Sequence, residues 1–127
     1  MDPILRNLTR DRAGDRCEYC GTHQNQDPFF AFHCEHIIAR QHGGATIETN
    51  LAWACHHCNL HKGPNLSGLD PTNGSMVALF NPRLQTWSDH FVTNGPIVVG
   101  ITPTGRTTIR VLDMNAAARV QLRAVPQ

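Results

Sequence analysis

Apolar and polar residues in the first half of the chain follow a pattern that predicts four short elements. Residues 2–16 carry scattered apolar side chains among arginines and aspartates, which is typical of a short helix. FFAFHCEHII is aromatic and β-branched enough for a strand, and Gly43-Gly44 then marks a loop. TNLAWAC indicates the returning strand, and HHCNLHK indicates a short helix that ends at Gly63-Pro64. The predicted order is a helix over 2–16, a strand over 29–38, a strand over 49–55 and a helix over 56–62.

The second half of the chain has a more strand-like pattern. Residues 64–75 are rich in Pro, Gly, Asn and Ser and predict a connecting loop. The β-rich stretch over 97–112 is expected to form a hairpin around Thr104-Gly105, and Asn115 is expected to cap a final helix over 116–124. Arg119 and Arg123 share one face of that helix, either solvated or in contact with phosphate. The remaining predicted elements are a strand over 76–82 and a helical turn over 84–91.

Length and charge narrow the class of protein only a little. At 127 residues the chain suits one compact unit, so we expect residues 65–127 to pack on residues 1–64. The net charge is +1, and residues 1–64 hold six Lys and Arg against seven Asp and Glu, so charge alone does not indicate a nucleic-acid partner. The start lacks the pattern of a signal peptide, and no apolar run reaches the ~18 residues of a membrane helix. We therefore expect a soluble, cytoplasmic protein without a membrane partner.

Two CxxC pairs supply the ligand types of a structural zinc site. Cys17-x-x-Cys20 and Cys55-x-x-Cys58 each present two thiolates at knuckle spacing, and together they can surround one tetrahedral Zn²⁺. The 34 residues between the pairs exceed the length of a compact zinc ribbon, so this insert must be a structured element.

Other residues of metal-binding type lie in the same segment. Seven of the eight histidines fall between residues 23 and 61. His56 and His57, inside the second CxxC pair, are either alternative ligands, exposed residues or phosphate contacts. Cys34 is the odd cysteine, and we expect it to be a small strand residue without a ligand role.

Three stretches of the insert and its flanks resemble the HNH endonucleases. They are EHIIARQHGG, TNLAWAC and CNLHKG, and the resemblance covers about residues 17–63. Members of that family have a ββα-metal (His-Me) finger, in which two antiparallel strands and a helix are clasped on a metal ion. Flanking CxxC pairs occur in many members. The resemblance implies the same finger here.

The resemblance also implies a role for each motif residue. Phosphodiester hydrolysis needs an activated water, a cation that neutralises charge on the phosphate, and positive groups that hold the backbone. His36 is implied to be the general base. Glu35 and Asn59 are implied to hold the catalytic divalent ion, and their oxygen ligands favour Mg²⁺ or Mn²⁺. Asn50 is implied to brace the loop and orient His36, with a plain turn residue as the alternative.

The letters HNH stand for the His, Asn and His of the family motif. In this chain the third motif position is Asn59 instead of histidine. Asparagine keeps an oxygen ligand, and His61 two residues later could compete for the role. Positive groups near the motif are candidates for contact with substrate phosphate, or else solvated side chains. These candidate substrate-binding residues are Arg40, Lys62, His33 and His61.

The sequence thus predicts an α+β fold. Residues 1–64 are expected to form a ββα-metal finger with a four-cysteine structural zinc site, and residues 65–127 a small β-rich extension with a hairpin and a helix. The predicted function is a metal-dependent endonuclease with nucleic acid, and DNA in particular, as its partner. Because the chain carries little positive charge, we expect a protein partner or self-association to assist targeting.

Two other classes of protein share part of the pattern. His33-x-Glu35 followed by Cys55-x-x-Cys58 echoes the zinc-dependent nucleobase deaminases. Ala54 stands in place of the proline of that signature, and the first CxxC pair and the two asparagines would have no purpose. A non-catalytic, zinc-organised module that binds nucleic acid is the stronger alternative.

Overall fold

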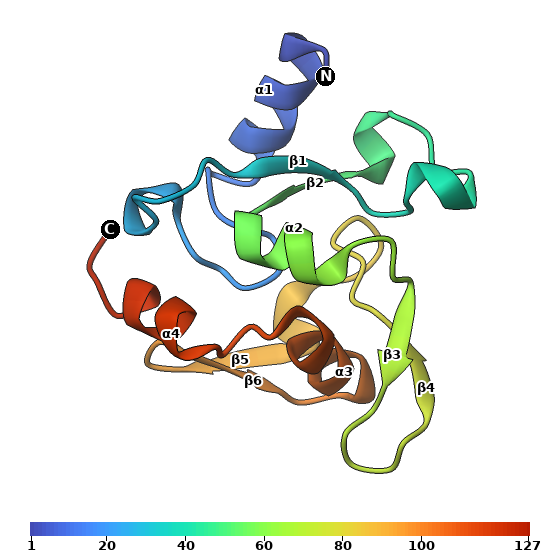
Figure 1. Cartoon of the computed structure of the whole chain (residues 1–127), viewed down its shortest axis with the longest axis vertical. Coiled ribbons are helices and arrows are strands. Elements are labelled where there is room, and N and C mark those ends of the chain that lie inside the picture. The colour runs from blue at the N-terminus through green and yellow to red at the C-terminus, as the bar shows by residue number, and fades with distance from the viewer.

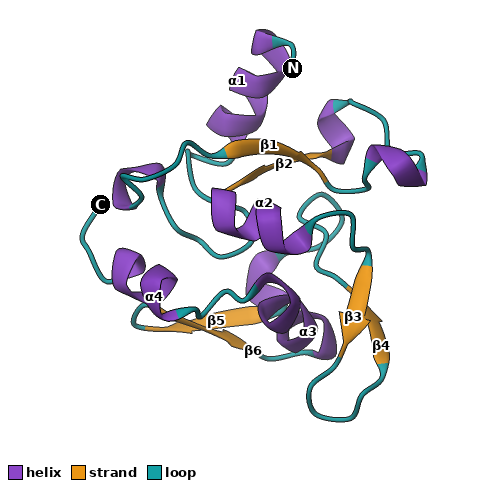
Figure 2. Cartoon of the chain, viewed as in Figure 1, coloured by secondary structure: helices purple, strands orange, loops and turns teal.

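The computed structural model describes residues 1–127, which form four helices and six strands joined by short 3₁₀ turns (Figures 1 and 2). The helices are α1 Pro3–Arg12, α2 His56–Lys62, α3 Pro103–Leu112 and α4 Ala117–Arg123. The strands are β1 His33–His36, β2 Leu51–Ala54, β3 Ser67–Leu69, β4 Met76–Ala78, β5 Phe91–Asn94 and β6 Ile97–Gly100. The 3₁₀ turns are Gln24–Gln26, Arg40–His42, Glu48–Asn50 and Trp87–Asp89.

Strands β1 and β2 and helix α2 form a ββα unit in the first half of the chain (Figure 1). The strands are antiparallel, with His36 opposite Leu51, and a single residue separates β2 from α2. Cys55 caps α2 because its sulfur accepts a hydrogen bond from the Cys58 N–H, and Gly63 ends the helix at a φ of 49°. The predicted strand, loop, strand, helix order is confirmed, and α2 has the predicted bounds.

Strand β1 is shorter than the predicted strand over 29–38, because the aromatic residues before it belong to a turn. The backbone N–H groups of Phe29 and Phe30 donate to Asp27 Oδ1 at 3.1 and 3.4 Å. Gln24 closes the same turn, since its Nε2 donates to Phe30 O at 3.0 Å and its Oε1 accepts from Phe32 N at 2.9 Å. Side-chain partners thus replace the hydrogen bonds that a sheet would supply.

The second half contains two further two-stranded sheets, β3–β4 and β5–β6, with helices α3 and α4. The hairpin predicted over 97–112 is wrong, because β6 pairs with the preceding β5 and residues 103–112 form α3. Thr102 and Pro103 explain this helix. Thr102 Oγ1 accepts from Gly105 N at 3.0 Å as an N-cap, and proline suits the first helical turn. Strand β3 likewise lies within the predicted loop over 64–75.

Helix α4 forms close to its predicted place, but Asn115 does not cap it. The N-cap is Ala116, whose side chain makes no capping hydrogen bond. Asn115 instead pairs with the backbone of Val98, accepting from its N–H at 3.0 Å and donating to its carbonyl at 2.8 Å. The amide therefore ties the segment before α4 to β6.

The two arginines of α4 bond to other parts of the fold. Arg119 is buried, and its Nη1 lies 2.9 Å from Asp27 Oδ2. Arg123 donates to the carbonyls of Pro96 and Met114, each at 2.8 Å. Both roles considered from the sequence, a solvated face or a phosphate contact, are therefore wrong for this pair.

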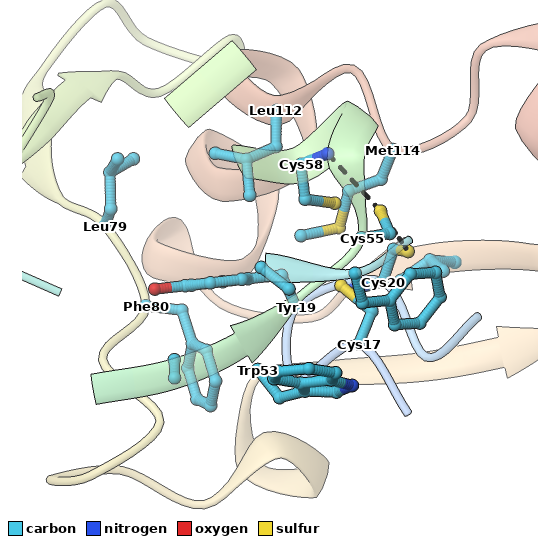
Figure 3. Close-up of a cluster of buried hydrophobic side chains, with 14 of the residues drawn as sticks. Cys17, Tyr19, Cys20, Trp53, Cys55, Cys58, Leu79, Phe80, Leu112 and Met114 are labelled. Carbon is cyan, nitrogen blue, oxygen red and sulfur yellow. Dashed lines mark hydrogen bonds between the residues drawn. The ribbon is translucent and has the colours of Figure 1, made fainter. Parts of the chain in front are cut away.

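One hydrophobic core includes residues from both halves of the chain (Figure 3). Tyr19 and Trp53 come from the first half, and Phe80 and Leu112 from the second. Burial of each such apolar side chain contributes about 1.5–3 kcal/mol. Helix α2 contacts both β1 and α3, so it lies at the junction of the two halves. No helix in the protein has the length and apolar character needed to cross a membrane.

Candidate functional site

The four cysteines of the CxxC pairs meet at one buried point. Their sulfurs lie within 4.8 Å of one another, and Figure 3 shows the four residues gathered at one end of the core cluster. The backbone N–H of Cys20 donates to Cys17 Sγ at 3.5 Å, and that of Cys58 donates to Cys55 Sγ at 3.3 Å. These bonds fix the geometry of each pair. The four-cysteine cluster is compatible with a zinc site, because four sulfurs of this spacing are the donor set that tetrahedral Zn²⁺ prefers.

The electrostatics of the cluster favour a bound cation. Burial raises the pKa of the Cys17 thiol, whereas hydrogen bonding with Cys17 lowers the pKa of Cys20. Several thiolates in a dry site repel one another, so a divalent cation is needed to hold them ionised together. Cys34, half-buried on β1, lies outside this group.

Glu35 points from β1 into the interior. Its side chain is 5% exposed, with Lys62 Nζ 2.5 Å from Oε1 and the Tyr19 hydroxyl donating to Oε2 at 2.7 Å. Burial raises the pKa of Glu35, and the charge of Lys62 opposes that rise. The structure thus pairs the carboxylate with an internal cation.

His36 ends β1 and is half-buried at the start of the loop over 37–50. Its Nε2 shares a hydrogen bond of 2.8 Å with Thr46 Oγ1, so the ring is anchored to the far side of that loop. Burial, and to a lesser extent the charge of Arg40, lower the pKa of His36. The imidazole is therefore mainly neutral at pH 7, which is the form that accepts a proton.

Asn50 closes the loop that follows β1. Its Oδ1 accepts from Ile38 N at 2.9 Å, and its Nδ2 donates to the carbonyls of Ile38 and Ala45 at 3.0 and 2.9 Å. Gly44 lies against the same segment, where an added Cβ would be 1.7 Å from the Ile38 carbonyl oxygen. The contact that holds the His36 ring comes from Thr46, while Asn50 acts on the backbone.

Asn59 is half-buried on α2, three residues before Lys62. Residues three apart on a helix share a face. Lys62 meets Glu35 on β1, so Asn59 lies on the side of α2 near that strand. The amide and carboxylate proposed as ligands from the sequence thus come from two elements that pack together.

Lys62 does not offer its ammonium to solvent. The side chain is 2% exposed, and Nζ donates to Ile37 O at 2.8 Å besides pairing with Glu35. Because Lys62 is buried and already paired, it is not free to make the contact with a substrate phosphate expected from the sequence. The lysine instead holds α2 against the end of β1.

The other candidates for phosphate contact have different surroundings. Arg40 is exposed in the 3₁₀ turn after β1. His33 Nε2 shares a hydrogen bond of 2.9 Å with His56 Nδ1, which joins β1 to the first turn of α2. One ring nitrogen of His61 lies within 4.8 Å of a ring nitrogen of His57 and of a carboxylate oxygen of Asp113.

Two residues of the site were missed from the sequence. Tyr19 lies between the first two cysteines and reaches Glu35, and Thr46 lies in the loop and reaches His36. A tyrosine inside a CxxC pair is usually an exposed residue, and nothing in the loop sequence distinguishes Thr46 from Thr49. Only the folded contacts reveal their partners.

Residues 17–65 match the family model of the HNH endonucleases. The matched segment contains both CxxC pairs, β1, β2 and α2. No curated protein and no solved structure matches the chain. Residues 17–65 are therefore similar to the HNH endonucleases, a family whose members are generally nucleases that act on nucleic acid. The cysteine cluster lies within this segment, and the small sheets β3–β4 and β5–β6 follow it.

Proposed function

We propose that the protein is a metal-dependent endonuclease that hydrolyses phosphodiester bonds in nucleic acid, with DNA as its substrate. The carrying observation is the HNH domain with His36 at the end of β1, half-buried and anchored on Thr46. The same segment carries Glu35 on β1, Asn50 in the turn before β2 and Asn59 on α2.

His36 would act as the general base. Thr46 occupies Nε2, so Nδ1 is the ring nitrogen left to accept a proton from water. The lowered pKa keeps the ring unprotonated at pH 7. Asn50 would support this role indirectly, because it fixes the backbone of the loop that carries Thr46.

Glu35 and Asn59 would hold a catalytic Mg²⁺ or Mn²⁺. An ionised carboxylate has about four lone-pair sites. In Glu35, Lys62 faces one carboxylate oxygen and Tyr19 donates to the other, so each oxygen keeps a lone pair for a metal ion. The donor set is therefore one carboxylate and one amide oxygen, which fits a hard cation. When bound, the ion would supply positive charge to the phosphate as cleavage proceeds. Lys62 would keep Glu35 ionised and in place.

The cysteine cluster would hold a structural Zn²⁺, separate from the reaction. It fixes the first turn of α2, the helix that carries Asn59 and Lys62. Arg40 and His33 would contact substrate phosphates.

A non-catalytic module that binds nucleic acid is the second candidate. The observation that favours it is the buried ion pair of Glu35 and Lys62, which gives the carboxylate a structural role without any metal. In that case the domain would bind nucleic acid without cutting it.

A cleavage assay across substrate types separates the two candidates. The zinc-loaded protein is incubated with and without added Mg²⁺ or Mn²⁺. The substrates are supercoiled plasmid, linear duplex DNA, single-stranded DNA and RNA. The nuclease proposal expects cleavage that requires the added ion. Binding without cleavage under every condition would support the non-catalytic module.

A further inference from the structure

We propose that Phe29, Phe30 and His56 form a stacking site for an unpaired nucleic-acid base, so that the preferred substrate is single-stranded or locally unpaired. The inference rests on the proposed function, since it places a base beside the proposed cleavage site. It assigns a binding role to Phe29 and Phe30, which have no part in the proposed reaction.

Both phenylalanine rings are exposed, and the Phe30 ring is held in place. Phe29 is 72% exposed and Phe30 is 54% exposed. The Phe30 ring stacks on the His56 imidazole, with centroids 4.3 Å apart and planes 21° from parallel. His56 is fixed in turn by its hydrogen bond with His33. Phe30 is therefore held in one orientation, with much of its surface open to a further planar ring.

The turn that carries the two phenylalanines is built before any ligand arrives. Asp27 Oδ1 accepts from both backbone N–H groups, and Asp27 Oδ2 pairs with buried Arg119. Gln24 holds the Phe30 carbonyl from the other side. A preformed site loses little conformational entropy on binding, so stacking energy is available for affinity.

The charge around the rings suits a polyanion. The Arg6 guanidinium lies over the Trp53 ring, 4.8 Å from the ring centroid, and donates to Phe32 O at 3.4 Å, two residues from Phe30. The carboxylate of this turn, Asp27, is buried and paired with Arg119. An aromatic platform beside positive charge, here that of Arg6, is the combination by which proteins bind single-stranded nucleic acid.

The platform lies beside the proposed active site. His33 and Glu35 are two residues apart on β1, so they point to the same side of the strand, and each contacts α2. His56 and Asn59 are three residues apart on α2, which puts their Cβ atoms about 5–6 Å apart on one face of the helix. A base on Phe30 would thus belong to a nucleotide close to the proposed metal ligands Glu35 and Asn59.

Stacking on Phe30 requires a base that has left its duplex. In double-stranded DNA both faces of each base are covered by its neighbours, so only a single strand, a strand end or a distorted site offers a free face. This geometry favours unpaired substrates and does not discriminate between base sequences.

The test uses a short DNA strand that contains the fluorescent base 2-aminopurine, and its duplex, without added Mg²⁺ or Mn²⁺. Stacking quenches this fluorophore. We expect the wild-type protein to quench it and to bind the strand more tightly than the duplex. Phe30→Ala should lose the quenching and bind the strand about 5- to 150-fold more weakly, whereas Phe30→Trp should keep both.

Met76→Ala is the matched control, because Met76 is an apolar side chain 77% exposed on β4, in a separate hairpin. It should change neither signal. Unaltered quenching and affinity in Phe30→Ala would overturn the inference, and so would equal affinity for strand and duplex. A concentration-dependent dimer that Phe30→Ala abolishes would also overturn it, by showing that the surface binds a second copy.

Cleavage measured with Mn²⁺ separates this inference from the proposed function. A wild-type protein that quenches 2-aminopurine but leaves every substrate intact would contradict the nuclease function and support the stacking site. A wild-type protein that cleaves, with Phe30→Ala cleaving single strands at unchanged KM, would contradict the stacking site alone.

Discussion

At the scale of single residues, Glu35 and His36 are neighbours in sequence with opposite environments. Glu35 points into the core and pairs with Lys62, while His36 is half-buried and held by Thr46. The alternation of side chains along β1 explains the separation. Burial raises the pKa of Glu35 against the opposing charge of Lys62, whereas burial lowers the pKa of His36 and favours its neutral form.

Replacement of Lys62 tests the buried ion pair. Lys62→Met would leave the Glu35 carboxylate buried without its cation, so we expect the free energy of unfolding to fall by about 3–5 kcal/mol. Urea unfolding measures this change. Arg40→Met, at an exposed position, should change stability by less than about 0.5 kcal/mol. Equal effects of the two substitutions would contradict the role given to Lys62.

The pH dependence of cleavage follows from the environment of His36. Because burial and Arg40 lower its pKa, the neutral base persists as the pH falls below about 6.5, the ordinary histidine value. We expect the acid limb of kcat/KM to lie below that value. Arg40→Gln removes one cause of the shift, so its acid limb should move upward. An acid limb that moves downward in this variant would contradict the assignment.

At the scale of elements, helix α2 combines the cysteine cluster, Asn59 and Lys62. Its bounds were predictable because a CxxC pair opens it and Gly63-Pro64 closes it. The stretch over 97–112 was misread because its β-branched residues outweighed the signal of Thr102-Pro103, a cap followed by a proline. Motif residues could be placed from sequence order. Their partners could not, because Lys62, Tyr19 and Thr46 meet the site only after α2, the first CxxC turn and the loop have packed.

Asn50 gives a test of the loop between β1 and β2. Asn50→Asp keeps an acceptor for Ile38 N but removes the two hydrogen bonds donated by Nδ2. We expect a lower melting temperature and slower cleavage, because the Thr46 anchor of His36 becomes mobile. Thr49→Ala, at an exposed position nearby, is the control for both measurements. Wild-type cleavage by Asn50→Asp would show that the loop needs no such brace.

At the scale of the whole molecule, one hydrophobic core connects the two halves. Tyr19 and Trp53 pack in the same core as Phe80 and Leu112, so the extension supports the finger. From the low net charge of +1 we expect few phosphate contacts, which would suit a substrate held partly by stacking. Shape and aromatic surface would then contribute more to binding than long-range charge.

Removal of a zinc ligand should unfold the finger. Structural zinc contributes on the order of 10 kcal/mol to a small domain, so Cys17→Ser should aggregate or lose its structure by circular dichroism. Elemental analysis should find about one tightly held zinc per wild-type chain, which Mg²⁺ does not displace. Cys34→Ser is the matched control and should keep both fold and zinc. A folded, zinc-free Cys17→Ser protein would contradict the site.

The most direct test of the nuclease proposal is the single-turnover cleavage rate of His36→Ala beside that of the wild type. Loss of a general base costs about 10²–10⁴-fold in rate, so we expect the variant to be slower by that factor. Its zinc content and melting temperature should stay close to wild type, because the His36 side chain makes one hydrogen bond at the edge of the fold. His42→Ala, in the exposed 3₁₀ turn nearby, should cleave at the wild-type rate. A His36→Ala protein that cleaves within a few-fold of wild type would contradict the account.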